Sequence, residues 1–154
     1  MSAEVKDYIN RERVEKLLAD LIKIPSPFFR EDEIMEYTLK WLKDKNLPAE
    51  YHEFHEKKVT DFEGKNVVGS LKSDEEGPTV LLNGHLDTVE ICEGWTKEPL
   101  GAKIEGDKMY GVGALDMKSG SAAIMLAVEA FANTVDNFNG EVLYTFVSDE
   151  EGPF

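Results

Sequence analysis

The stretch VLLNGHLDT at residues 80–88 decides the fold, because it joins an apolar run to a histidine and an aspartate. Residues 80–83 have the pattern of a buried strand, and Gly84 frees the backbone to turn after it. In extended backbone, His85 and Asp87 lie on one face because they are two residues apart. Asp87 could then orient the imidazole of His85 as a metal ligand. An exposed His–Asp pair in a turn is the alternative interpretation.

A second motif, GVGALDMK at residues 111–118, precedes an apolar segment at 119–133 that is typical of a buried helix. Gly111 and Gly113 superficially resemble a dinucleotide-binding fingerprint. However, Asp116 stands in place of the third glycine, where its carboxylate would repel a pyrophosphate. At the entrance to a helix, Asp116 is better placed to bridge two cations. An ordinary acid in the first turn of a helix is the alternative.

A third motif, SDEEG at residues 148–152, follows the strand-like run at 141–147. Three adjacent carboxylates repel one another, so packing them at a strand end is costly unless cations offset the charge. The side chains of Glu150 and Glu151 diverge, so one could bind a metal while the other handles a proton. A solvated acidic turn is the alternative. One histidine and several acids suit a divalent ion such as zinc.

Hydrophobic periodicity and turn residues predict strands that alternate with helices, which indicates an α/β protein. We expect a twisted mixed β-sheet flanked by helices, with its central strand at residues 141–147. The sequence contains no repeat and no linker that would divide it into two domains. The predicted helices span about 14–22, 31–45 and 119–133, and the predicted strands span 49–56, 66–71, 79–83 and 141–147, with a hairpin at 102–110.

Composition restricts the partners and the compartment. A formal net charge of -14 argues against nucleic acid and anionic membranes as partners, because both would be repelled. The single cysteine, Cys92, cannot form an internal disulfide, and no apolar run has the length of a signal or a membrane span. We therefore expect a cytoplasmic protein. His52 and His55 lack the spacing of a metalloprotease motif and are expected to be structural or surface residues.

Taken together, the three motifs resemble those of the co-catalytic zinc hydrolases. This family includes acetylornithine deacetylase, succinyl-diaminopimelate desuccinylase, aminoacylase and the glutamate carboxypeptidases. The resemblance rests on GHLDTV at 84–89, YGVGALDMKSG at 110–120 and SDEE at 148–151, and it begins at the IPSP turn at 24–27. It implies hydrolysis of an amide bond in a small peptide or an N-acyl amino acid. It also implies two zinc ions, for which cobalt or manganese can substitute.

The resemblance implies a role for each of five residues. His85 would bind one zinc, Glu151 would bind the second, and Asp116 would bridge both. Glu150 would act as the general base, and Asp87 would orient His85. A cis peptide bond after Asp116 is frequent in the family.

The chain departs from this family in its length. Full-length members are more than twice as long and add a lid and dimerisation domain, a further acidic ligand and a final histidine. We therefore expect residues 1–154 to form the N-terminal portion of a catalytic domain, without the homodimer interface. Each zinc would have two protein ligands where three are usual, so weak or partial occupancy and little activity are expected. The alternative is a non-catalytic folded module with vestigial ligands that self-associates through an exposed sheet edge.

Overall fold

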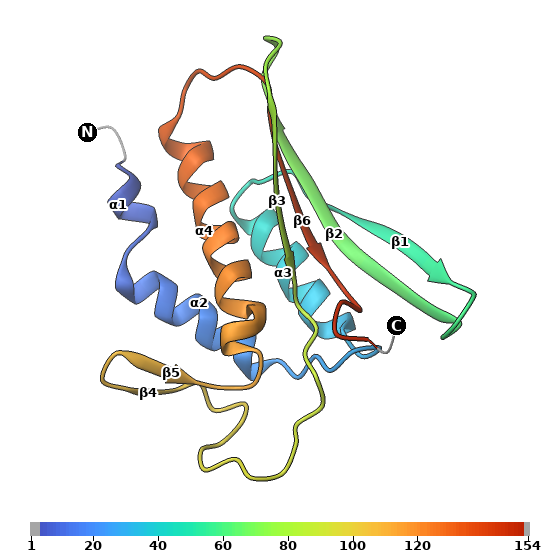
Figure 1. Cartoon of the computed structure of the whole chain (residues 1–154). Helices are drawn as coiled ribbons and strands as arrows, with labels where there is room; N and C mark the ends of the chain where they lie inside the picture. Colours follow the sequence, from blue (N-terminus) through green and yellow to red (C-terminus); the bar gives the residue numbers. More distant parts are fainter. Residues whose placement is uncertain (1–3, 153–154) are drawn as a thin grey trace.

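The computed structural model describes residues 4–152, which form a four-stranded mixed sheet and a two-stranded hairpin (Figure 1). No helix in this range is both long and apolar enough to cross a membrane. The helices are α1 (Val5–Tyr8), α2 (Arg11–Lys23), α3 (Asp32–Asp44) and α4 (Ser119–Thr134), and a kinked turn, η1 (Ala114–Lys118), leads into α4. The strands are β1 (Glu50–Glu56), β2 (Phe62–Lys72), β3 (Thr79–His85), β4 (Lys103–Glu105), β5 (Lys108–Tyr110) and β6 (Glu141–Val147).

The sheet has the strand order β1-β2-β6-β3, which confirms that the strand at 141–147 is central. Strands β1 and β2 are antiparallel, as are β2 and β6, whereas β3 and β6 run parallel. In the parallel pair His85 lies opposite Val147. The segments after β3 and β6 therefore leave the sheet at the same end of the two strands, their carboxyl end, which is where sites form in open α/β sheets.

The helices cover one face of the sheet and build the hydrophobic core with it (Figure 1). Helix α4 packs against β3 and β6, α3 packs against β2, and α2 lies on α4. The inward side chains of the sheet include Val67, Tyr144 and Phe146, all of them 0% exposed. Tyr144 and Phe146 are two residues apart in β6, as the alternation of a strand requires. The expectation of helices flanking a mixed sheet is confirmed.

Strand β2 begins at Phe62, four residues earlier than predicted. The sequence predicts Gly64 in a loop, but this residue lies within the strand. A Cβ atom at Gly64 would lie 2.5 Å from the ring of Phe54 and 2.7 Å from that of Phe62. The glycine therefore makes room for two aromatic rings and does not mark a turn. The hairpin of β4 and β5 matches its prediction.

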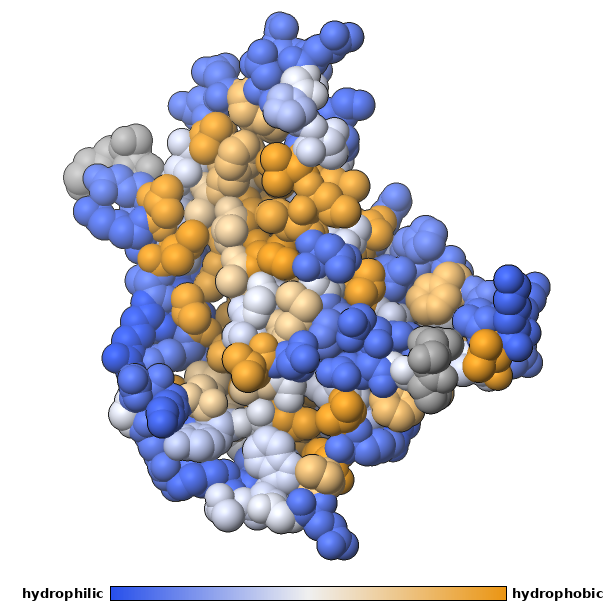
Figure 2. All heavy atoms as spheres, in the orientation of Figure 1, coloured by the Kyte–Doolittle hydropathy of each residue, from blue (hydrophilic) through white to orange (hydrophobic). Residues whose placement is uncertain are grey.

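The expectation that residues 80–83 are buried is wrong, because β3 forms an edge of the sheet. Val80 is 50% exposed and Leu81 is 57% exposed. Apolar side chains gather over α4 and β3 on the face shown in Figure 2. A continuous apolar run is the pattern of a strand covered by neighbours. Within residues 4–152, however, β3 pairs with β6 alone.

Candidate metal centre

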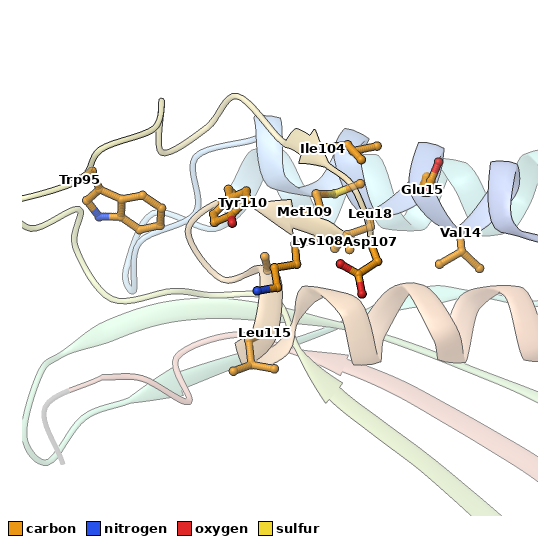
Figure 3. Close-up of a pocket in the computed structure, with 12 residues that line it drawn as sticks. Val14, Glu15, Leu18, Trp95, Ile104, Asp107, Lys108, Met109, Tyr110 and Leu115 are labelled. Atoms are coloured by element: carbon orange, nitrogen blue, oxygen red, sulfur yellow. The ribbon is translucent and has the colours of Figure 1, made fainter.

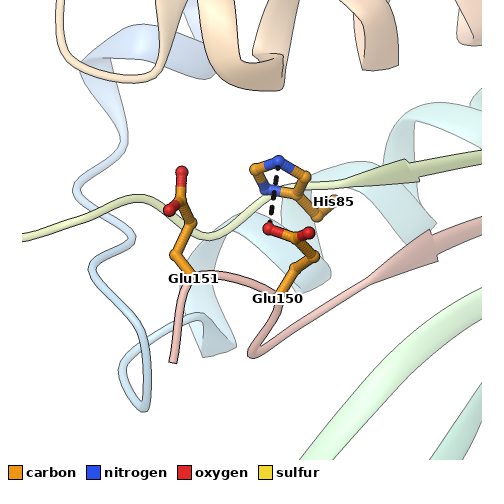
Figure 4. A group of neighbouring side chains, drawn as sticks. All are labelled: His85, Glu150 and Glu151. Carbon is orange, nitrogen blue, oxygen red and sulfur yellow. Dashed lines mark ion pairs between the residues drawn. The ribbon is translucent and has the colours of Figure 1, made fainter. Parts of the chain in front are cut away.

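Three side chains that follow neighbouring parallel strands meet at one point (Figure 4). His85 ends β3, and Glu150 and Glu151 lie in the turn after β6. One ligand atom from each of the three lies within 4.8 Å of the others. His85 is 5% exposed, whereas Glu150 is exposed. The group therefore has a buried imidazole on its inner side and a carboxylate open to solvent.

The imidazole of His85 is held through one nitrogen and faces acids with the other. Its Nδ1 donates to the backbone carbonyl of Asp87 at 3.1 Å, and Oδ1 of Asp87 is 3.5 Å from the same nitrogen. A carbonyl oxygen only accepts, so this contact requires a proton on Nδ1. Nε2 faces Oδ1 of Asp116 at 3.1 Å and Oε2 of Glu150 at 3.7 Å. Nε2 is therefore the atom available to a metal, and the backbone of Asp87 makes the shorter orienting contact.

The buried carboxylate of Asp87 joins the ends of the two strands. Its side chain is 0% exposed, and Oδ2 accepts a hydrogen bond from the backbone N–H of Glu151 at 2.7 Å. Among the described residues, its Oδ1 has no hydrogen-bond partner. Asp87 thus contacts both the imidazole and the turn that carries the two glutamates.

The acids around His85 change its affinity for protons. Asp87 beside the ring raises the pKa of His85 to about 9; burial opposes this shift, and Asp116 adds to it. Burial also opposes the ionisation of Asp87. The neighbouring His85 and the backbone N–H groups of Glu151 and Glu150 nevertheless hold the pKa of Asp87 below its usual value. In the absence of a metal, His85 is therefore a cation at neutral pH.

Asp116 lies in η1, whose backbone is fixed at both ends. Gly113 adopts φ 69°, and the peptide bond after Asp116 is cis, as the resemblance implies. The buried Lys118 donates from Nζ to the carbonyl oxygens of Leu21 and Ile24, each at 2.9 Å, at the end of α2. Burial lowers the pKa of Lys118 to about 8. These contacts tie the segment that carries Asp116 to the helical layer.

Two polar side chains that lie outside the three sequence motifs contact the turn after β6. Oδ1 of Asn66 accepts from the N–H of Ser148, and Oε1 of Glu31 accepts from the N–H of Asp149, both at 3.1 Å. Burial raises the pKa of Glu31 to about 7, although backbone hydrogen bonds favour its ionised form. In sequence, Glu31 is only an acid at the start of a predicted helix, and Asn66 carries no signal.

The remaining histidines lie away from this group. His52 and His55 belong to β1, the edge strand opposite to β3. Nε2 of His55 is 2.7 Å from Oδ1 of Asp61, an exposed residue beyond the strand. The expectation that both are structural or surface residues agrees with these positions.

The donor set at the strand ends fits a divalent ion. Zinc takes imidazole nitrogen and carboxylate oxygen at about 2.0–2.2 Å, so ligand atoms on one ion lie roughly 3–4 Å apart. His85, Glu150 and Glu151 approach this spacing, and Asp116 lies within 3.1 Å of the free nitrogen of His85. One imidazole and three carboxylates at these distances have the chemistry of a zinc, cobalt or manganese site.

A separate cavity of about 450 Å³ lies between α2 and the β4–β5 hairpin (Figure 3). Its lining is mainly apolar and includes Leu18, Trp95 and Tyr110. The cavity contains neither His85 nor the acids around it. One of its lining residues, Leu115, is 92% exposed and directly precedes Asp116 in the sequence.

Comparison with known sequences identifies peptidase and desuccinylase relatives. Residues 81–154 match the model of peptidase family M20/M25/M40. Succinyl-diaminopimelate desuccinylase of Wolinella succinogenes is 33% identical over 139 residues, which are 90% of this chain and 34% of the relative. The enzyme of the same name from Thioalkalivibrio sulfidiphilus is 39% identical over 85 residues, 54% of this chain and 23% of the relative. The chain thus spans at most about a third of these relatives.

Comparison with solved structures shows the same fold. Human carnosine dipeptidase 1 superposes with a TM-score of 0.76 and 21% identity, covering 92% of this chain and 32% of the dipeptidase. An M20 family metallo-carboxypeptidase from Sulfolobus solfataricus gives a TM-score of 0.75 at 21% identity, with the same coverage. The YXEP protein of Bacillus subtilis, described as a dinuclear metal-binding peptidase, gives 0.61 at 20% identity over 91% of this chain and 35% of that one.

Proposed function

Because this chain belongs to peptidase family M20/M25/M40, we propose that it is the N-terminal part of a metal-dependent hydrolase that cleaves an amide bond in a small peptide or an N-acyl amino acid. The meeting of His85, Glu150 and Glu151 at neighbouring strand ends carries the proposal. The desuccinylase relatives support this class of reaction without selecting one substrate. The single Cys92 is an exposed thiol, which supports a reducing, cytoplasmic compartment.

We propose for each side chain the role that the resemblance to the zinc hydrolases implies, and the contacts of the side chains are compatible with these roles. Nε2 of His85 and a carboxylate oxygen of Glu151 would each hold one metal ion, and Asp116 beside Nε2 would bridge the two. Zinc bound there supplies Lewis-acid polarisation of the scissile carbonyl and a more acidic water. The exposed Glu150 takes the proton of the attacking water and returns it to the leaving nitrogen. Asp87 orients His85.

Metal titration of the purified chain tests this proposal. We expect weak zinc binding, because the assigned ligands give each ion two protein donors where three are usual for catalytic zinc. Calorimetry should show this binding in the unaltered chain and none in His85→Ala. His55→Ala is the matched control, since it removes an exposed histidine that also contacts an aspartate. Stoichiometric binding that survives in His85→Ala contradicts the proposal.

The same titration has an expected pH dependence. A metal must displace the proton from Nε2 of His85, whose pKa is about 9 in the metal-free protein. Affinity should therefore rise about tenfold per pH unit up to pH 9 and level off above it. The stability of the metal-free protein depends on pH in the opposite direction. The raised pKa stabilises the fold fully below pH 6.5, and this contribution is lost as the pH rises through 9.

A second candidate function, self-association of a non-catalytic module, is favoured by the edge strand β3. Within residues 4–152 one side of β3 pairs with no strand, and this side together with the exposed Val80 and Leu81 forms an apolar template for a second copy of this chain. Sedimentation should then show a fraction of dimer that rises with protein concentration and is lost in Leu81→Lys. Val59→Lys, at a turn residue that is 69% exposed, should leave the dimer intact. A monomer at all concentrations rules this function out.

A further inference from the structure

We propose that Glu31, a buried carboxylate outside the metal group, is a positioning residue that fixes the turn carrying Glu150 and Glu151. The inference rests on the proposed function, because it concerns where those two carboxylates are held. It adds a residue that none of the three sequence motifs contains. The residue acts through the backbone of Asp149 and has no contact assigned to the metal group itself.

The backbone of this turn is held by side chains from three distant segments. The N–H of Ser148 donates to Asn66, that of Asp149 donates to Glu31 and that of Glu151 donates to Asp87. These acceptors come from β2, from the residue before α3 and from the segment after β3. The position of both glutamates therefore depends on three side-chain acceptors.

Asp149 is the residue of the turn that most needs such an anchor. It adopts φ 65°, in the left-handed region that L-residues other than glycine disfavour, and it is only 9% exposed. A hydrogen bond to its N–H at 3.1 Å holds this backbone in place. Without the acceptor, the N–H would be buried and unpaired, which is unfavourable. The turn would then relax, and Glu150 and Glu151 would move with it.

Glu31 is suited to this task because its own backbone is fixed. It is 3% exposed and stands at the N-terminus of α3, where its carbonyl accepts from the N–H of Met35 at 3.0 Å. Ile34 and Met35 of the same helix are fully buried in the core. The carboxylate is thus a rigid extension of the helical layer that reaches the turn. Functional side chains need to be held within about 0.5 Å, which this construction allows.

Two substitutions separate the hydrogen bond from the bulk and charge of Glu31. Glu31→Gln keeps an oxygen that can accept from Asp149, whereas Glu31→Met keeps the shape and removes the acceptor. Glu129→Met is the matched control, because Glu129 is also buried, at 4% exposed, but its ion pairs are with Arg13 of α2 and with Lys45 just after α3.

Amide hydrogen exchange of the metal-free chain, followed by NMR, is the first readout, and the affinity for Co²⁺ is the second. In Glu31→Met we expect exchange at Asp149 to be about 10–100-fold faster, since the N–H loses its acceptor. We expect the Co²⁺ dissociation constant to rise about 10–100-fold, as for other groups that orient ligands. Glu31→Gln should restore both to within about threefold of the unaltered chain. Glu129→Met should lower stability and change neither.

Each outcome decides the role of Glu31. Unchanged exchange and affinity in Glu31→Met overturn it, and so does an equal change in Glu31→Gln or in Glu129→Met. If Glu31→Met does not fold, Glu31→Asp takes its place, because the shorter side chain keeps the charge and loses the reach. If the unaltered chain binds no Co²⁺, the proposed function fails. The exchange measurement still decides whether Glu31 holds the turn.

Discussion

Replacing Asp87 with alanine is expected to lower the free energy of unfolding by about 3–5 kcal/mol, because it removes one partner of a buried charged pair. Asp87 is 0% exposed and contacts both His85 and the N–H of Glu151. Without it, the imidazole loses its counter-charge and the N–H loses its acceptor. Metal affinity should also fall about 10–100-fold, since the carboxylate that contacts the imidazole and accepts from the turn of Glu151 is gone, although the backbone carbonyl that accepts from His85 remains. Urea unfolding at pH 7 and Co²⁺ titration measure the two effects.

The variant Asp87→Asn separates charge from position. The amide oxygen can still accept from Glu151, so we expect a smaller loss of stability than in Asp87→Ala. The pKa of His85, which Asp87 raises to about 9, should fall toward its ordinary value because the neighbouring charge is gone. NMR titration of the imidazole measures this shift.

A second pair of residues in the chain provides the control for Asp87. His55 and Asp61 are also in contact, with 2.7 Å between Nε2 and Oδ1, but the side chain of Asp61 is 83% exposed. Asp61→Asn should change stability by no more than about 1 kcal/mol, as is usual for exposed pairs. If Asp87→Ala costs as little as Asp61→Asn, then Asp87 does not hold the two strand ends together.

Two of the three motifs located the candidate site from sequence because each combines a local strand signal with polar residues at its end, whereas Asp116 stands before a predicted helix. A strand-like apolar run precedes His85, and another precedes Glu150 and Glu151. This pattern indicates that these side chains lie where β3 and β6 end. The parallel pairing of β3 with β6 then brings them together. Residues up to four positions beyond a strand end could therefore be predicted. Their individual roles in catalysis stay a proposal.

The supporting residues could not be predicted, because they depend on contacts across long sequence separations. Glu31 and Asn66 reach the turn after β6 from 118 and 82 residues away. No local pattern distinguishes a carboxylate that accepts from a distant N–H from one that faces solvent. The same holds for Gly64, where the aromatic ring of Phe54 leaves no room for a Cβ atom. The exposure of β3 also follows from which strands surround it and not from its own sequence.

Replacing Gly113 with alanine is expected to lower the free energy of unfolding by about 3 kcal/mol, through two effects of similar size. The residue adopts φ 69°, where an L-residue is strained by about 1–2 kcal/mol. The new Cβ would also lie 2.5 Å from Cγ2 of Thr88, which is only 2% exposed and cannot move away freely. Because Asp116 follows three residues later, metal affinity should fall as well.

Gly106 isolates the backbone part of this effect. It has nearly the same conformation, φ 66°, but a Cβ atom there would meet nothing within 4 Å. Gly106→Ala should therefore cost only the strain, about 1–2 kcal/mol, and leave metal affinity unchanged. Adding Thr88→Ser to Gly113→Ala removes the atom that is struck and keeps the hydroxyl. The double variant should regain the part of the free energy of unfolding by which the loss in Gly113→Ala exceeds the loss in Gly106→Ala. If Gly113→Ala and Gly106→Ala cost the same in urea unfolding, the contact between η1 and the segment after β3 does not position Asp116 beside His85.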